Sequence, residues 1–261
     1  MGLAFTILGS GSSGNATLLS DGKIHVLLDV GLSGRETVRR LRECGLGPED
    51  IAAVVVSHEH GDHCRGVGPF AKDLDIPVFM TEGAYCGSQI SLDSKKLCKF
   101  RSGQSFDVYG IQFTSFSVPH DSVDPIAFVI EKDGVKIAVA LDLGYISNLA
   151  IERLKGSDAI ILESNHDVQM LKAGPYPWAL KQRVMSRHGH LSNDSVAQYL
   201  ANDFDGKADL VVLAHLSQKN NLPELALLSA RRALEERSGL RLVQTRLELA
   251  KPDQISKTYR Y

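Results

Sequence analysis

A dense run of metal-type side chains places the strongest constraint on this chain. Three histidines and one aspartate lie within the run His58-Glu59-His60-Gly61-Asp62-His63. The run directly follows 51–56, an apolar and partly β-branched stretch that is expected to form a strand. Gly61 gives the turn backbone freedom, so the side chains of one short loop can point toward two neighbouring cations. The spacing therefore predicts a fold in which a buried strand delivers a metal-binding loop.

A polar surface turn with incidental histidines is the alternative interpretation of this run. A single histidine, or even a pair, usually has that meaning. A solvated turn, however, has no need for this whole set of groups, whereas neutral imidazoles and carboxylates suit Zn, Mn or Fe. The cluster therefore favours a metal site.

Short apolar stretches alternate with helical patterns through the rest of the chain. Strands are expected at 5–8, 16–19, 24–28, 51–56, 112–118, 127–131, 135–140, 158–162 and 210–213. Helices are expected at 34–45, 65–74, 148–155, 193–203 and 223–237. This order is typical of helices that cover the outer faces of two sheets. We therefore expect residues 1–261 to form a single mixed α and β domain without a linker.

Composition excludes several classes of protein. The chain is 43% hydrophobic and 23% charged, and it has neither a run of membrane-spanning length nor a signal-peptide pattern. Its net charge of -2 gives no global reason to bind nucleic acid. The four cysteines contain no C-x-x-C pair, which argues against a disulfide framework or a thiolate zinc site. We expect a cytoplasmic protein that has no membrane partner.

The spacing H-x-H-x-D-H is the signature of the metallo-β-lactamase superfamily, and the chain resembles that family along almost its whole length. The resemblance implies the α/β (α+β) class, as a four-layer αββα sandwich of two mixed β-sheets flanked by helices. It also implies three further ligands at the ends of later strands. These are His120 after 113–118, Asp142 at the end of 138–141, and His215 after 211–214.

The same resemblance implies how the ligands divide between two divalent metal ions. By analogy His58, His60 and His120 hold one ion. Asp62, His63 and His215 hold the other, and Asp142 bridges them. Such a binuclear site implies a hydrolase that uses a metal-bridging hydroxide, with Asp62 helping to orient it. The donors fit Zn or Mn, and also Fe, so the metal identity stays open.

Two later segments, 162–166 and 189–193, resemble the phosphodiesterase branch of the superfamily, which includes ribonuclease Z. Glu163 and His190 match the pattern of that branch, in which a glutamate ends a strand and a histidine lies at the start of a helix. A carboxylate can hold an imidazole as its cation, ready to contact phosphate or to protonate a leaving alkoxide. The alternative is that His190 only packs against the helix cap, which Ser192 or Asn193 would provide.

Over residues 1 to about 250 the chain looks most similar to the YycJ/WalJ group of this superfamily. The matching segments are 9–15, 57–60, 163–167, 187–193 and 214–217. The resemblance implies a manganese-dependent 5′-to-3′ exonuclease that acts on DNA. No inserted domain or protruding arm for gripping nucleic acid is visible, and the scattered basic residues are equally typical of a solvated surface. Those residues are Lys95, Lys96, Lys99, Arg101, Arg183 and Arg187.

Two other functions remain open beside the nuclease. A thioester or lactone hydrolase of this fold needs the same metals but has less use for Glu163 and His190. A regulatory protein could keep the site as a structural feature, although a complete set of ligands argues against that interpretation. The sequence also leaves open the choice among DNA, RNA and small phosphodiesters, the polarity of cleavage, the oligomeric state and the pathway.

Overall fold

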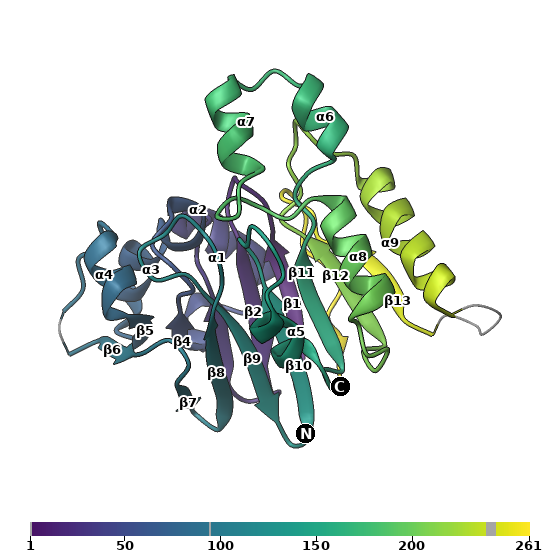
Figure 1. The fold of residues 1–261 in the computed structure, drawn as a ribbon. Helices are drawn as coiled ribbons and strands as arrows, with labels where there is room; N and C mark the ends of the chain where they lie inside the picture. The colour runs from purple at the N-terminus through teal and green to yellow at the C-terminus, as the bar shows by residue number, and fades with distance from the viewer. Residues whose placement is uncertain (1, 94, 239–243) are drawn as a thin grey trace. The chain divides into compact units, whose positions relative to one another are not determined.

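The computed structural model describes residues 2–93, 95–238 and 244–261. Over these residues, two mixed β-sheets of seven strands each are flanked by helices (Figure 1). This is the predicted fold class. The chain divides into two compact units, of which unit 1 comprises 1–117, 122–135 and 251–261 and unit 2 comprises 118–121 and 136–250. Each unit is described in turn.

Unit 1 contains all strands of the first sheet. In spatial order they are β14 (Tyr259–Arg260), β1 (Ala4–Gly9), β2 (Ala16–Ser20), β3 (His25–Leu28), β4 (Ile51–Val55), β5 (Val78–Thr81) and β6 (Leu97–Phe100). The strands β3, β4, β5 and β6 pair in parallel. Because parallel strands end at the same edge of a sheet, the residues that follow β3 and β4 emerge side by side.

Unit 1 also contains an antiparallel ladder of β7 (Ser105–Val108), β8 (Ile111–Ser117) and β9 (Ile126–Lys132). Aromatic rings join this ladder to the first sheet. Phe106 of β7 stacks on Phe79 of β5 and on Phe100 of β6, with ring centroids 5.6 and 4.3 Å apart. Phe128 meets Phe113 edge-on at 5.8 Å. Burial of these large rings makes the region a main part of the core.

The helices of unit 1 connect the strands of the first sheet. They are α1 (Gly34–Glu43), α2 (Gly61–Cys64), α3 (Val67–Leu74) and α4 (Glu82–Gly87), with a 3-10 turn at Pro48–Asp50. Ser33 begins α1, where its side chain accepts a hydrogen bond from the amide of Glu36. The buried Arg40 of α1 donates to the carbonyls of Leu8 and Pro252, at 2.6 and 2.9 Å. The helix is thus fixed to both termini of the chain.

Unit 2 is built on the parallel strands β10 (Val135–Ala140), β11 (Ala159–Glu163), β12 (Leu210–Ala214) and β13 (Arg246–Leu249). The first three are nearly continuous apolar runs, as expected for strands that are covered on both faces. The helices are α5 (Asn148–Leu154), α6 (Val168–Ala173), α7 (Trp178–Val184), α8 (Asn193–Asn202) and α9 (Pro223–Ser238). Helix α8 runs beside α9, and α6 and α7 stand beyond them (Figure 1).

The predicted strands and helices are present, with ends that differ by at most two residues. Two differences affect the candidate site. Residues 61–64, expected in a turn, form the short helix α2, and the helix predicted at 65–74 begins only at Val67 as α3. Strand β10 ends at Ala140, so Asp142 lies two residues beyond the strand instead of ending it.

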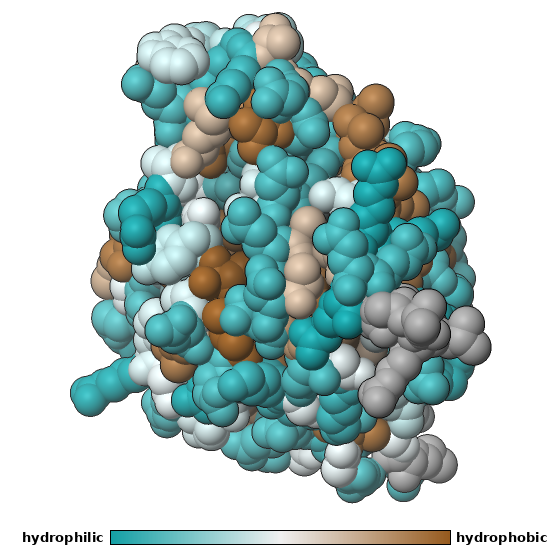
Figure 2. Space-filling model, turned by 45° about the vertical axis from the view of Figure 1, so that its right-hand side comes forward, coloured by the Kyte–Doolittle hydropathy of each residue, from teal (hydrophilic) through white to brown (hydrophobic). Residues whose placement is uncertain are grey.

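The exposed surface is mainly hydrophilic on the face that Figure 2 shows. Hydrophobic residues appear there in small groups separated by hydrophilic ones. Isolated exposed hydrophobic residues of this kind are usual for a folded domain. None of the helices in the described part of the chain combines the length and hydrophobicity of a membrane-spanning segment.

Candidate metal centre

The histidine loop of unit 1 leaves the carboxyl end of β4 and turns into α2. His60 begins this helix, and its carbonyl accepts hydrogen bonds from the amides of His63 and Cys64, at 2.9 and 3.0 Å. His58 and His63 are buried, whereas His60 and Asp62 are partly exposed. One helical turn therefore places Asp62 and His63 next to His58 and His60 in a compact group of donors.

Asp29 fixes the orientation of His63. It follows β3 with a left-handed backbone, φ 61°, and its Oδ2 lies 2.7 Å from Nδ1 of His63. An acceptor at Nδ1 assigns the ring proton to that nitrogen and leaves the lone pair on Nε2, the form that metal-bound histidines take. The amide nitrogen of Asn15, 3.0 Å from Nε2, fits the same tautomer.

Ser57 extends this arrangement to His58. Its amide and its hydroxyl both donate to the carboxylate of Asp29, at 2.8 and 2.9 Å. Because the hydroxyl proton is given to Asp29, the Ser57 oxygen is an acceptor for Nδ1 of His58, 3.0 Å away. His58 is thereby oriented in the same way as His63, with its lone pair on Nε2.

Asp29, Ser57 and Asn15 contact the candidate histidines, and sequence analysis assigned no role to them. The available signal was weak: Asp29 is a polar residue directly after an apolar strand, at the edge where the histidine loop also emerges. A non-glycine residue with positive φ at that point is a further mark of a constrained site, but only the structure shows it.

In unit 2, three adjacent parallel strands each end at or just before a candidate site residue. Glu163 is the last residue of β11, while Asp142 and His215 follow β10 and β12. Donor atoms of these three residues and of His190 lie within 4.8 Å of one another. Asp142 and His215 both have left-handed backbones, with φ 53° and 54°, which is uncommon outside glycine and is concentrated at functional sites.

Glu163 organises this group from a fully buried position. Its Oε2 accepts hydrogen bonds from the amides of Leu143 and Leu191, at 3.0 and 3.1 Å. Its Oε1 lies 2.7 Å from Nδ1 of His190 and 3.0 Å from Nδ1 of His215. Burial raises the pKa of Glu163, but the charge and hydrogen bond of His190 outweigh burial and lower this pKa to about 2. Glu163 is therefore ionised at neutral pH.

His190 is the positive partner of this carboxylate. Burial lowers the pKa of His190, yet the negative charges of Glu163 and Asp142 outweigh burial and raise the pKa to about 10. Its Nδ1 lies 3.1 Å from Oδ1 of Asp142, and its side chain is 21% exposed. The ring can therefore meet a substrate while it stays protonated at neutral pH.

His120 lies beside His190, with ring centroids 5.1 Å apart. Its Nδ1 donates to the carbonyl of Gly189 at 3.1 Å, which again leaves the lone pair on Nε2. Burial lowers the pKa of His120, so the ring is neutral, as a metal ligand requires. The neighbouring Asp121, which sequence analysis left outside the site, forms an ion pair with Arg183.

The predicted residues thus form two groups. The loop of unit 1 holds His58, His60, Asp62 and His63, and unit 2 brings together His120, Asp142, Glu163, His190 and His215. Four of the five histidines that were predicted as metal ligands have an oriented Nδ1, which fits the requirement that metal-binding imidazoles be held by a further hydrogen bond. Neutral imidazoles with carboxylates are a donor set for divalent metal ions.

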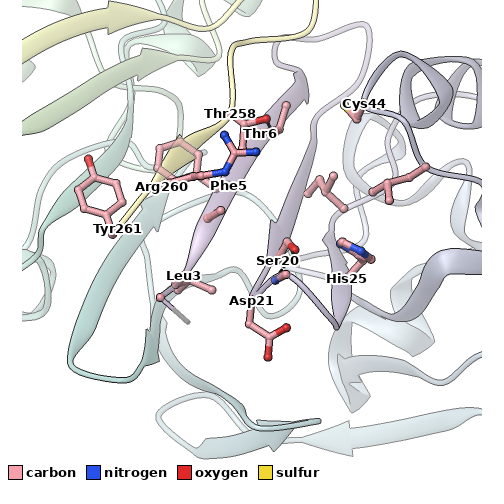
Figure 3. Close-up of a pocket in the computed structure, with 15 residues that line it drawn as sticks. Leu3, Phe5, Thr6, Ser20, Asp21, His25, Cys44, Thr258, Arg260 and Tyr261 are labelled. Carbon is pink, nitrogen blue, oxygen red and sulfur yellow. Dashed lines mark hydrogen bonds between the residues drawn. The ribbon is translucent and has the colours of Figure 1, made fainter.

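A cavity of about 400 Å³ in unit 1 lies away from this chemistry. It is lined mainly by β1, β2 and the chain's last residues, and Figure 3 shows His25, Ser20 and Asp21 at one side of it. His25 begins β3, whereas Asp29 follows the other end of that strand. The cavity is therefore separate from the histidine loop.

The chain is similar to two curated exonucleases over most of its length. It is 36% identical to "Exodeoxyribonuclease YycJ" of Bacillus anthracis over 242 residues, which is 91% of each chain. It is also 36% identical to "Exodeoxyribonuclease WalJ" of Streptococcus pneumoniae over 231 residues, which is 87% of this chain and 86% of the relative.

The structural comparison agrees at the level of the fold. The crystal structure of the metallo-β-lactamase fold protein YhfI from Bacillus subtilis is similar with a TM-score of 0.77 and 17% sequence identity, and the match covers 100% of both chains. In sequence, residues 25–216 match the model of the Beta-lactamase superfamily domain. The strand-end donors and the two mixed sheets are explained by this relationship: the chain belongs to the β-lactamase superfamily.

Proposed function

We propose that this chain is a metal-dependent phosphodiesterase that degrades DNA from the 5′ end. The observation that carries the proposal is the ion pair of His190 and Glu163, which lies directly beside Asp142. A partly exposed cationic donor at this place suits an anionic phosphodiester and has less use with a thioester or a lactone. The names of the two relatives support DNA as the substrate.

The proposal assigns the metal ions to the seven residues of the family pattern. His58, His60 and His120 would hold one ion, Asp62, His63 and His215 would hold the other, and Asp142 would supply its carboxylate to this site. In this proposal both units act together as one domain, 1–261. The ions are Mn or Zn, with Fe as a further candidate, because all three accept mixed nitrogen and oxygen donors. When bound, they supply a water-derived nucleophile at neutral pH and neutralise phosphate charge.

His190 moves the proton that the leaving group requires. Because Glu163 holds Nδ1, the proton on Nε2 is the one directed to a substrate. As the water oxygen bonds to phosphorus, the bond from phosphorus to the leaving oxygen breaks, and Nε2 gives that oxygen its proton. Asp62 orients the attacking water, and Glu163 stabilises the His190 cation before the transfer.

The four cysteines further support a cytoplasmic protein. Cys44, Cys64, Cys86 and Cys98 are all free thiols, which fits a reducing compartment. Burial raises the pKa of the Cys64 thiol to about 12, with a smaller contribution from nearby carboxylates. Cys64 therefore stays protonated and unreactive although it directly follows His63.

The role of His190 is tested by comparing two leaving groups. The variant His190→Asn is expected to lose roughly 100-fold or more in kcat on DNA, because the alkoxide leaving group needs a proton. The variant should lose far less kcat on bis(p-nitrophenyl) phosphate, because its nitrophenolate leaving group departs without being protonated. His188→Asn, two residues away and exposed, is the matched control. Equal losses on both substrates would show that His190 binds phosphate and does not act as the acid.

The same assays separate the alternative functions. Wild-type protein loaded with Mn is expected to hydrolyse both phosphodiesters and to leave thioesters and lactones intact. Turnover of a thioester or lactone without phosphodiester turnover would replace the proposal by the other hydrolase class. Inactivity on every substrate, with two metal ions bound, would favour a regulatory protein that keeps the site only as structure.

A further inference from the structure

The segment between Glu163 and His190 is the most distinctive feature of unit 2 that the proposed chemistry does not use. The chain leaves the candidate site at Glu163, forms α6 and α7, and returns at His190, whose Nδ1 lies 2.7 Å from Glu163. In Figure 1 the two helices stand away from the strands of unit 2 and are joined by a loop. Both ends of the segment are therefore anchored at the Glu163–His190 pair.

The two helices are held firmly in place. The buried Lys181 of α7 donates from Nζ to the carbonyl of Lys172 in α6, at 2.6 Å. Asp167 begins α6 by accepting from the amide of Met170 at 2.8 Å. At the far end Arg183 pairs with Asp121, the residue after His120. A segment fixed in this way loses little conformational entropy when it binds a ligand.

The charge of the segment is opposite to that of the whole chain. Residues 164–190 contain two lysines and two arginines but only one acidic residue, Asp167, whereas the chain carries a net charge of -2. Lys181 is buried, and Arg183 is exposed but engaged with Asp121. Lys172 and Arg187 are the other exposed lysine and arginine of the segment. Such a local excess of cations favours a polyanion over a neutral ligand.

Aromatic side chains accompany these cations. Trp178, the only tryptophan of the chain, is the first residue of α7 and is 63% exposed. Nearby in unit 2, the guanidinium of Arg187 lies 4.3 Å from the centre of the Tyr145 ring, and Nζ of Lys219 lies 6.0 Å from that of Tyr176. Proteins that hold single nucleic-acid strands combine exposed aromatic rings with cations in this way, because every base offers a face for stacking.

We propose that the α6–α7 segment binds a single DNA strand, with a base stacked on Trp178 and the phosphates near Lys172 and Arg187. This inference rests on the proposed nuclease function and names the part of the surface that grips the substrate. An exonuclease must separate a terminal nucleotide from its partner strand, and stacking on Trp178 compensates for the base stacking that is lost.

The single tryptophan provides a direct measurement that does not depend on catalysis. Metal-free protein is titrated with an oligothymidylate while the fluorescence of Trp178 is recorded. We expect quenching, a dissociation constant that rises steeply with salt, and a roughly 10-fold or greater loss of affinity in Trp178→Ala, which is followed by anisotropy of a labelled oligonucleotide. Trp178→Phe keeps a stacking ring and is expected to retain most of the affinity.

A matched control separates stacking from the loss of any exposed hydrophobic residue. Leu228→Ala removes a 45% exposed side chain from α9 and is expected to leave DNA binding unchanged. Unquenched Trp178 fluorescence, or equal affinity in wild type and Trp178→Ala, would overturn the proposal. In active protein, Trp178→Ala should raise KM for DNA more than it lowers kcat. If wild type binds the strand but hydrolyses no phosphodiester, the proposed function fails while the binding surface stands.

Discussion

Several side chains at the candidate centre act by orienting a neighbour. Asp29 and Ser57 hold two rings of the histidine loop, at 2.7 and 3.0 Å, while Glu163 holds His215 and His190 at 3.0 and 2.7 Å. A metal-binding histidine keeps its ring orientation when the ring nitrogen that does not bind the metal is fixed by a hydrogen bond of this kind. The binding of metal should therefore depend on residues that never touch the ion.

Replacing Asp29 tests this dependence on the side of unit 1. Asp29→Asn keeps the size of the side chain but removes the charge that holds His63 and Ser57. We expect roughly 10- to 100-fold weaker Mn binding, measured by calorimetry on metal-free protein. Asp253→Asn, at an exposed position, is the control. Unchanged Mn affinity in Asp29→Asn would contradict the orienting role.

Replacing Glu163 tests the charge state of His190. In wild type the pKa of His190 is raised to about 10, so its ring is protonated at neutral pH. Glu163→Gln removes the negative charge that contributes most to raising the pKa of His190. This pKa should therefore fall, and the ring should lose its proton at a lower pH. NMR titration of the histidine rings in metal-free protein measures this directly. A His190 titration at the same pH in both proteins would show that Glu163 is not the cause.

At the level of single residues, the sequence offered the candidate ligands, and the structure adds the residues that contact them. The nine predicted residues carry their chemistry in their own side chains. Eight of them end or follow strands, and His190 precedes a helix, so a spacing pattern can reveal them. Asp29 and Asn15 gain their roles only through contacts across neighbouring loops. The support of His120 is the main-chain carbonyl of Gly189, which leaves no signal in residue type.

Among the elements, the start of α8 is tied to β11 and α9 by buried amides. The side-chain nitrogen of Asn221 donates to the carbonyls of Ser164 and Asn165, at 2.9 and 3.0 Å. Asn193, the first residue of α8, donates to the side-chain oxygen of Asn221 at 2.8 Å. Because buried polar groups need partners, these bonds fix how the helices meet the strand that carries Glu163.

Loss of the side-chain amide of Asn221 should destabilise the fold strongly. Asn221→Ala would remove a donor from the carbonyls of Ser164 and Asn165 and the acceptor of Asn193, and we expect a loss of about 2–3 kcal/mol in the free energy of unfolding. Urea denaturation measures the change. Asn202→Ala, exposed near the end of α8, should cost much less. A loss below about 0.5 kcal/mol for Asn221→Ala would contradict the importance of the network.

The turn between β2 and β3 gives a prediction for the pH dependence of stability. Burial raises the pKa of Asp21, but hydrogen bonds from Ile24, Lys132 and Lys23 outweigh burial and hold this pKa below its usual range. A depressed pKa stabilises the fold above the unfolded-state pKa, and this contribution is lost as pH falls through the folded-state value. Asp21→Asn should therefore flatten the decline in stability below about pH 5. Parallel declines in both proteins would contradict this account.

The elements that sequence analysis missed are short or lie at edges. It gave no strand at β5, β6, β7, β13 or β14 and no helix at α4, α6 or α7. Strand β7 alternates polar and apolar residues but has only four of them, which is too short a run to distinguish a strand from a loop. Helices α6 and α7 have six and seven residues, which is too short for periodicity, and they depend on tertiary contacts such as that of Lys181.

For the whole molecule, the proposed ligands come from segments that are distant in sequence and belong to both units. If both units supply ligands to the same ions, metal binding should stabilise the two together. We expect chelation to lower Tm and Mn to restore it, with about 2.7 kcal/mol gained at 100 times Kd. Asp142→Ala should lose most of this gain. Separate transitions for the two units, only one of which responds to Mn, would contradict a shared centre.

In the proposed mechanism the protein degrades DNA from the 5′ end, and its site is formed by the seven metal ligands together with Glu163 and His190. The most direct test of this mechanism is digestion of duplex DNA, labelled at either the 5′ or the 3′ end, by Mn-loaded wild type and Asp142→Ala. The account predicts that wild type releases the 5′ label at once as a mononucleotide, that the 3′-labelled strand shortens progressively, and that Asp142→Ala does neither. Intact DNA in the presence of wild type with both metal ions bound, or equal digestion by Asp142→Ala, would contradict it.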